Sequence, residues 1–153
     1  MALSKETKGF IKRVREIKSL INPTLKQVFT VKKAEVIKIN TEQQLYDKGE
    51  NALKISLKIK NPYKPRTVEI KKIKGQPSDR VTLNDTGAFY KSFKVIPRKN
   101  EVEIIATSVK TEHLVKKYGE EILGLQEGFL KTFYEDNIEP KLEKKINDKL
   151  TKL

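Results

Sequence analysis

The sequence predicts a single α+β domain, with a β-hairpin between short helices and a long helix near each end. Three observations lead to this fold class. Apolar residues recur at helical spacing near both ends of the 153-residue chain. Two alternating apolar and polar segments flank a proline-containing turn in the second half, as in a small antiparallel sheet. No repeat or linker interrupts the chain, so one domain covering residues 1–153 is expected.

The chain is strongly basic and contains no cysteine. Its net charge is +13, and residues 1–33 and 53–80 each hold nine Lys or Arg residues against two acidic ones. Such segments predict an anionic partner: nucleic acid, a membrane surface or an acidic protein face. A lysine-rich surface that only keeps the protein in solution explains the excess equally well. Without cysteine, disulfides and thiolate metal sites are excluded, and synthesis in the cytoplasm is expected.

The sequence carries no sign of membrane insertion or secretion. It has no run of about 18 apolar residues, the length needed to cross a bilayer. Its first residues lack the apolar core of a signal peptide. We therefore expect no membrane partner.

Residues 4–21 form the first predicted helix. One face carries an apolar stripe with a period of about 3.6 residues. This stripe consists of Phe10, Val14, Ile17 and Ile21. Ser4 is the expected N-cap, and we expect the stripe to pack into a core rather than lie on a membrane. The Asn22-Pro23 pair is expected to end or kink the helix, because proline disfavours helix at the preceding residue.

Residues 24–60 lead into the centre of the chain. Residues 24–39 carry both helical and strand-like spacing, and both assignments stay open. Thr41 to Lys48 is predicted as a helix, with Thr41 as N-cap and Gly49 as the C-terminal stop. Leu53 to Ile59 alternates apolar and polar residues, which predicts a strand with one buried face.

The central basic segment, residues 53–92, contains two groups of turn residues. An extended, proline-containing turn precedes a predicted short helix from Arg66 to Lys74. In the second group, Asn84 to Gly87, Asp85 or Thr86 is expected to cap a single helical turn from Ala88 to Lys91. The basic side chains that we expect to contact an anionic partner are Lys64, Arg66, Lys71, Lys72, Lys74 and Arg80.

The rest of the chain predicts a β-hairpin, a short helix and a closing helix. Two strands are expected within residues 91–107, on either side of the Pro97–Asn100 turn. Thr111 to Gly119 predicts a short helix that its glycine ends. Residues 126–153 are predicted as a long helix with a break or kink at Pro140.

Residues with catalytic potential are sparse. His113 is the sole histidine, so a cluster of histidine metal ligands is excluded. Asp85-Thr86-Gly87 matches the short motif of aspartic proteases, but the strand-rich setting and the second carboxylate that such a dyad needs are missing. No glycine-rich phosphate loop ending in Gly-Lys-Ser/Thr occurs. The sequence therefore predicts no catalytic, cofactor-binding or metal-binding residues, and a protein that is not an enzyme.

Four short segments follow one another through the middle of the chain. They are Pro65-Arg66-Thr67, Lys71-Lys72-Ile73-Lys74-Gly75, Leu83-Asn84-Asp85-Thr86-Gly87-Ala88-Phe89-Tyr90-Lys91-Ser92 and Tyr118-Gly119. In this order the chain resembles, over roughly residues 40–150, the phage virion-morphogenesis family of tail-completion and head–tail joining proteins. The family's usual tryptophan before the first segment is absent, and Tyr63 is its nearest counterpart. Lys116-Lys117 stands where the family often has His or Glu.

The resemblance implies a non-enzymatic structural protein of the virion, at the head–tail junction or in the tail. Its subunits would form a homo-oligomeric ring and contact portal, connector or tail proteins. It would reside in the virion after synthesis in the cytoplasm of a bacterial host. A basic face would meet an acidic neighbouring ring or line a channel for phage DNA. The alternative is a sequence-nonspecific nucleic-acid-binding protein that uses its basic front half.

The motif residues are expected to build structure rather than catalyse a reaction. They are Leu83, Asp85, Thr86, Gly87, Phe89, Ser92, Tyr118 and Gly119. Thr86 and Gly87 would form a capped tight turn that directs Phe89 and Phe93 into the core. Ser92 would bond a backbone group at the start of the strand.

Overall fold

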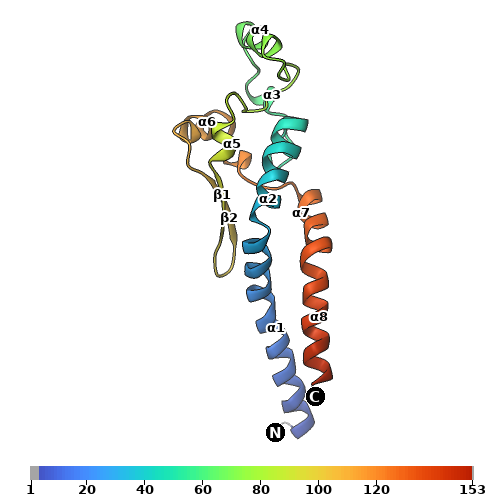
Figure 1. The fold of residues 1–153 in the computed structure, drawn as a ribbon. Helices are drawn as coiled ribbons and strands as arrows, with labels where there is room; N and C mark the ends of the chain where they lie inside the picture. Colours follow the sequence, from blue (N-terminus) through green and yellow to red (C-terminus); the bar gives the residue numbers. More distant parts are fainter. Residues whose placement is uncertain (1–3, 153) are drawn as a thin grey trace.

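The computed structural model describes residues 4–152 and confirms the α+β class. The molecule is elongated, with a two-helix stem below a head of short elements (Figure 1). In chain order the elements are α1 (Lys5–Val31), α2 (Lys33–Lys38), η1 (Ile39–Lys48), α3 (Leu57–Lys60), α4 (Pro65–Ile73), α5 (Ala88–Lys91), β1 (Phe93–Pro97), β2 (Val102–Ala106), α6 (Thr111–Tyr118), η2 (Glu120–Ile122), α7 (Glu127–Phe133), η3 (Tyr134–Ile138) and α8 (Glu139–Thr151). We define the stem as α1 and α8, which run antiparallel with both chain ends at its tip, and the head as the elements from η1 to η2.

Helix α1 begins as predicted but does not end at Pro23. The Ser4 hydroxyl accepts a hydrogen bond from the Thr7 amide at 3.1 Å, which confirms the N-cap. The helix continues to Val31 with Pro23 inside it, so the predicted end near residue 21 is wrong. Beyond the proline, Thr24 is buried and accepts a hydrogen bond from Lys145 on α8 at 3.1 Å. The packing of the second half of α1 therefore stabilises the helix by more than the loss of one backbone hydrogen bond at Pro23 destabilises it.

The predicted packing of the N-terminal apolar stripe is not found. Phe10 is 64% exposed and Ile21 is 41% exposed, while Val14 and Ile17 are only half-buried. The buried residues of α1 are Thr24, Val28 and Phe29. Phe29 packs on Phe133 with ring centroids 5.1 Å apart. Helix α8 lies against this part of α1, but it leaves the stripe half-buried or exposed rather than buried.

Residues 24–48 are helical except for Lys32, which joins α1 to α2, and this resolves the ambiguous stretch in favour of helix. Thr41 is not a cap: it is buried within the helix and its hydroxyl donates to the Ile37 carbonyl at 2.8 Å. The predicted stop at Gly49 is confirmed by its left-handed φ of 62°. The last part, η1, is π-helical. Its Asn40 and Gln44 side chains contact the connector that joins η2 to α7, residues 123–126, and the end of η2 at Ile122.

Buried amide side chains join η1 to the connector before α7. Asn40 accepts from the Gly124 amide at 2.9 Å and donates to the Ile122 carbonyl at 3.0 Å. Gln44 accepts from the Gln126 amide at 2.7 Å and donates to the Gly124 carbonyl at 2.7 Å. Buried amides in this position need every donor and acceptor satisfied, so the network fixes the connector against η1.

The predicted strand from Leu53 to Ile59 is wrong. Leu57 is fully buried, whereas Ile59 is 80% exposed, so the alternation does not produce one buried face. The Asn51 side-chain oxygen accepts from the amides of Leu53 and Ile55, at 2.9 and 3.0 Å. This local bonding makes a turn that competes with strand pairing. Only an isolated bridge, Glu50 with Ser56, stays as extended pairing, and helix α3 follows it.

The other predicted short helices and the hairpin are confirmed. Helices α4, α5 and α6 lie where the sequence placed short helices, and β1 pairs antiparallel with β2, with Val95 opposite Ile104. The C-terminal helix runs without a break from α7 through the π-helical η3 into α8, and Pro140 lies in the first turn of α8. The predicted interruption at Pro140 is therefore a change from π-helical to α-helical backbone and not an end of the helix. Two buried clusters result. One joins α1, the hairpin and η3, and the other fills the head around Phe89, Phe93 and Tyr118.

Candidate ligand groove in the head

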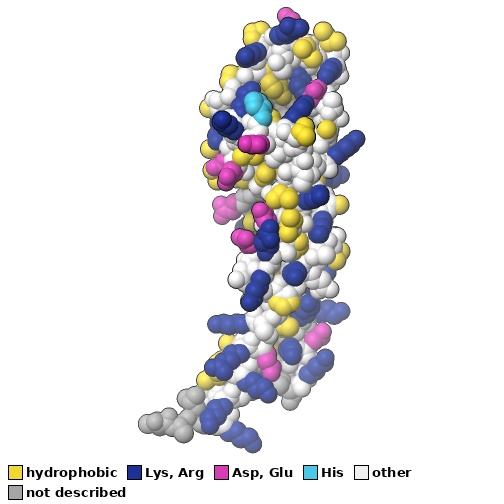
Figure 2. All heavy atoms as spheres, turned by 90° about the vertical axis from the view of Figure 1, so that its left-hand side faces the viewer, with side chains coloured by type: hydrophobic (Ala, Val, Ile, Leu, Met, Phe, Trp, Pro, Cys, Tyr) yellow, Lys and Arg dark blue, Asp and Glu magenta, His cyan; other side chains and the backbone are white. Residues whose placement is uncertain are grey.

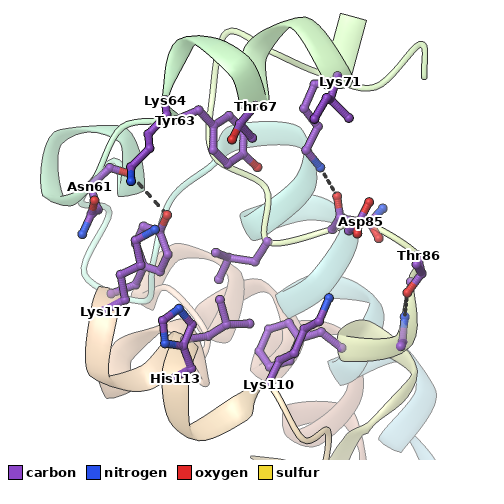
Figure 3. Close-up of a pocket in the computed structure, with 18 of the residues that line it drawn as sticks. Asn61, Tyr63, Lys64, Thr67, Lys71, Asp85, Thr86, Lys110, His113 and Lys117 are labelled. Atoms are coloured by element: carbon purple, nitrogen blue, oxygen red, sulfur yellow. Dashed lines mark hydrogen bonds between the residues drawn. The ribbon is translucent and has the colours of Figure 1, made fainter. Parts of the chain in front are cut away.

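A cavity of about 610 Å³ opens in the head between α4, the turn before α5, and α6 (Figure 3). Its walls include most of the motif residues and half of the basic side chains singled out from the sequence. We call it the head groove. The lining residues are Asn61, Pro62, Tyr63, Lys64, Thr67, Ile70, Lys71, Lys74, Leu83, Asn84, Asp85, Thr86, Gly87, Ala88, Phe89, Lys110, His113, Leu114, Lys117 and Tyr118.

The motif turn forms one edge of the head groove and makes the expected tight turn, but the cap of α5 is Gly87 and not Asp85 or Thr86. Gly87 takes a φ of +85°, which suits glycine, and the Thr86 hydroxyl accepts from the Ala88 amide at 3.4 Å. The turn sends Phe89 into the core, where its ring lies edge-on to Phe93 at 5.0 Å. Ser92 donates to the Phe89 carbonyl at 2.7 Å. Leu83, at the start of the turn, also has a positive φ of 57°.

The second motif pair supports the floor of the head groove. Tyr118 is buried, and its hydroxyl donates to the Asn61 carbonyl at 3.3 Å. Burial also raises the pKa of the Tyr118 phenol above its ordinary value. Gly119 ends α6 with a φ of +96°, a conformation that other residues rarely adopt.

Lys71 is held inside the head rather than presented to a partner. It is 6% exposed, and its ammonium donates to Gln76 at 3.0 Å and to the Asn84 carbonyl. The same ammonium lies 5.6 Å from the centre of the Tyr63 ring. Figure 3 shows the side chain reaching from α4 toward the motif turn. Lys71 therefore ties α4 to the turn, which departs from the surface contact expected from the sequence.

Two further basic side chains also bind other groups of the protein. Lys74 forms an ion pair with Asp85 at 2.7 Å. This hydrogen bond lowers the pKa of the Asp85 carboxyl more than burial raises it, and the charges of Lys74, Lys71 and Lys110 lower the pKa further. Arg80 donates to the Tyr46 carbonyl at 2.7 Å and pairs with Asp79 at 2.8 Å. Of the six predicted contact residues, Lys64, Arg66, Lys72 and Lys74 are exposed, and Lys74 is the one of these that is paired with a carboxylate.

Helix α6 contributes cations that the sequence reasoning missed. The cations are Lys110, the N-cap residue of α6, and Lys117, and they face α4 from the lower side of the head groove together with the imidazole of His113 (Figure 3). Their spacing of three and four residues places them on one helical face, and this was the available signal. Within residues 4–152, neither Lys110 nor Lys117 nor Lys64 forms an ion pair.

The head groove thus offers cations at its rim and apolar side chains at its base. Asp85 is the sole acidic residue of the lining and is already paired with Lys74. Such a site can bind an anionic group by charge, and its chemistry does not require a metal. Between residues 4 and 152, no three His, Cys, Asp or Glu side chains lie together as metal ligands. No helix in the same range is long and apolar enough to cross a membrane.

Comparisons of the chain with protein-family models, with curated proteins and with solved structures found no match.

Proposed function

We propose that this protein is a non-enzymatic assembly subunit of a phage virion. It would act at the head–tail junction or in the tail, through contacts with other copies and with portal, connector or tail proteins. The observation that carries the proposal is the stem, where α8 lies against one side of the outer part of α1 but no side chain of that part is buried. The resemblance of the central motifs to the virion-morphogenesis family gives the proposal its biological setting.

The stem exposes large apolar side chains, which do not stabilise an isolated chain. No side chain between Lys5 and Pro23 is buried, although this part of α1 is regular helix. Exposed large apolar residues of the stem and of the adjoining α7 and η3 are Phe10, Ile21, Val31, Leu130, Tyr134 and Leu150. Helices in proteins gain most of their stability from packing an apolar face. A neighbouring subunit that covers this face would stabilise the stem.

The motif residues support the same reading. Thr86, Gly87 and Ser92 make backbone turns and hydrogen bonds, and Phe89 and Tyr118 fill the core. Asp85 is half-exposed and paired with a lysine, which favours a carboxylate that is ionised at neutral pH over a catalytic acid. These roles suit a scaffold that presents surfaces to partners.

Sedimentation and reconstitution test this proposal. We expect the purified chain to form rings, or to form them when a portal or tail protein from the same phage is added. Replacing Phe10 and Ile21 by Ser should abolish the assembly. Val109→Ser is the matched control, because Val109 is 98% exposed and lies on a loop away from the stem. A wild-type chain that stays monomeric with every such partner, or a double variant that assembles normally, would refute the proposal.

Nucleic-acid binding is a second candidate, favoured by the basic face of α1. Lys12, Arg13, Arg15 and Lys18 are all exposed and form no ion pair within residues 4–152. A DNA-binding titration at several salt concentrations distinguishes the candidates. Micromolar binding with a steep salt dependence would favour this second function, whereas loss of binding at about 0.15 M salt would argue against it.

A further inference from the structure

We infer that the head groove binds an acidic peptide segment that carries an apolar side chain, supplied by a neighbouring virion protein. This inference rests on the proposed assembly function, because it names the chemistry of one partner contact. It differs from the stem contact in place and in character. The stem offers an apolar helix face, whereas the head groove offers a charged rim around an apolar base.

The rim supplies positive charge that the protein does not neutralise. Lys64 lies at the start of α4. Across the cavity lie Lys110, directly before α6, and Lys117, on α6. Each is exposed, and within residues 4–152 none is paired with a carboxylate. His113 lies between Lys110 and Lys117 on the same face. Figure 2 shows this histidine beside lysine or arginine side chains in the upper part of the molecule. Carboxylates arriving here would meet several cations at once.

The base of the head groove is apolar and large. Leu83, Leu114 and Ile70 contribute aliphatic surface, and Phe89 lies beneath them. The cavity volume of about 610 Å³ is that of sites that bury several side chains or a small organic ligand. An inorganic anion would use the rim but leave this base uncovered. A peptide with acidic residues around an apolar side chain would use both.

The aromatic residues argue against a nucleic-acid strand in the same place. Single-stranded nucleic acid gains much of its binding from bases stacked on exposed aromatic rings. Here Phe89 and Tyr118 are buried, and the Lys71 ammonium lies over the ring of Tyr63. The head groove therefore lacks an open stacking surface, and a protein segment fits its chemistry better.

Selection from a library of random short peptides, with the whole chain as bait, tests the inference. We expect the enriched peptides to combine Asp or Glu residues with an aromatic or branched apolar residue. Bound to the isotope-labelled chain, they should shift the NMR signals of Thr67, Thr86 and Leu114, which line the head groove. Enrichment of peptides without acidic residues, or no enrichment, would overturn the inference.

Two triple variants separate the head groove from general charge attraction. The first variant combines Lys64→Gln, Lys110→Gln and Lys117→Gln. Its affinity for the selected peptides should be about tenfold lower, because three exposed ion pairs are lost. The second variant, the control, combines Lys8→Gln, Lys12→Gln and Lys18→Gln on the exposed face of α1. It lowers the net charge by the same amount as the first variant and should leave peptide binding unchanged. All six side chains are exposed, so both variants should fold, as circular dichroism would verify. Equal weakening by both variants, or by neither, would refute the inference.

A competition experiment assigns the remaining outcomes. An oligothymidylate that displaces the peptide at lower concentration would identify the head groove as a nucleic-acid site and overturn the inference. Displacement by millimolar phosphate alone would reduce it to a simple anion site. Ring formation by the stem does not depend on these three lysines. A chain that assembles but binds no acidic peptide therefore refutes this inference alone, whereas failed assembly refutes the proposed function.

Discussion

Lys71 shows how a single buried cation organises the head. Its ammonium donates to Gln76 and to the Asn84 carbonyl, and so connects α4 to the motif turn. Lys71→Met keeps much of the aliphatic stem but removes these donors, and we expect it to lower the free energy of unfolding by about 1–3 kcal/mol. Urea denaturation measures the loss. Lys72→Met, at an exposed neighbouring position, should change it by less than about 0.5 kcal/mol. Equal effects of the two substitutions would contradict the role given to Lys71.

The Asp85 carboxyl provides a pH-dependent prediction. Because the hydrogen bond from Lys74 lowers its pKa, we expect its NMR titration midpoint to lie below the ordinary 3.8. Lys74→Gln should move the midpoint toward that value, whereas Lys72→Gln should not. An unchanged midpoint in Lys74→Gln would contradict the cause assigned here.

The sign of the linked stability follows from this shift. The Asp85 carboxyl has a lower pKa in the folded chain than in the unfolded chain. Its contribution to stability is therefore complete above the ordinary pKa and disappears as pH falls through the folded pKa. Both side chains are about half exposed, at 46% and 51%, so solvent screening limits this contribution to less than about 1 kcal/mol.

At the scale of elements, alanine substitutions at two glycines with similar φ distinguish the cost of backbone strain from the cost of a steric clash. Gly49 has a φ of 62° and Gly75 a φ of 66°. A Cβ at Gly75 would meet nothing within 4 Å, so Gly75→Ala should cost about 1–2 kcal/mol of stability from conformation alone. A Cβ at Gly49 would lie 2.9 Å from the Arg80 Cβ and 3.0 Å from the Val81 carbonyl oxygen. Gly49→Ala should therefore cost about 1–3 kcal/mol more. Thermal unfolding of the two variants measures the difference, and equal losses would contradict this contact.

At the scale of the whole molecule, stability should be distributed unevenly between stem and head. Amides between Lys5 and Pro23 belong to a helix without buried side chains, whereas the Gln126 amide donates to Gln44 inside the head at 2.7 Å. Hydrogen exchange of the free chain should therefore be faster in this part of α1 by at least about tenfold. Assembly should slow exchange there and leave the Gln126 amide unchanged. Equal protection in the free chain would contradict the proposal that the stem is completed by a partner.

Elements with strong local signals could be predicted from the sequence. The prolines and glycines around α4, the polar turn before α5, and the alternation on both sides of the hairpin turn each act within a few residues. The motif turn was predicted for the same reason, since Thr86 and Gly87 determine their own backbone geometry. The proposed function still depends on the resemblance and on the exposed apolar side chains of the stem, and its tests are those given above.

The sequence by itself determined the fold class, the hairpin, the short helices and the concentration of positive charge. Only the tertiary structure decided where α1 ends, that Leu53 to Ile59 is not a strand, and that Lys71 lies inside the head. It also brought Lys110 and Lys117 opposite Lys64. The physical reason is distance along the chain. Caps, turns and periodicity act between near neighbours, whereas burial and ion pairing depend on residues that meet only after folding.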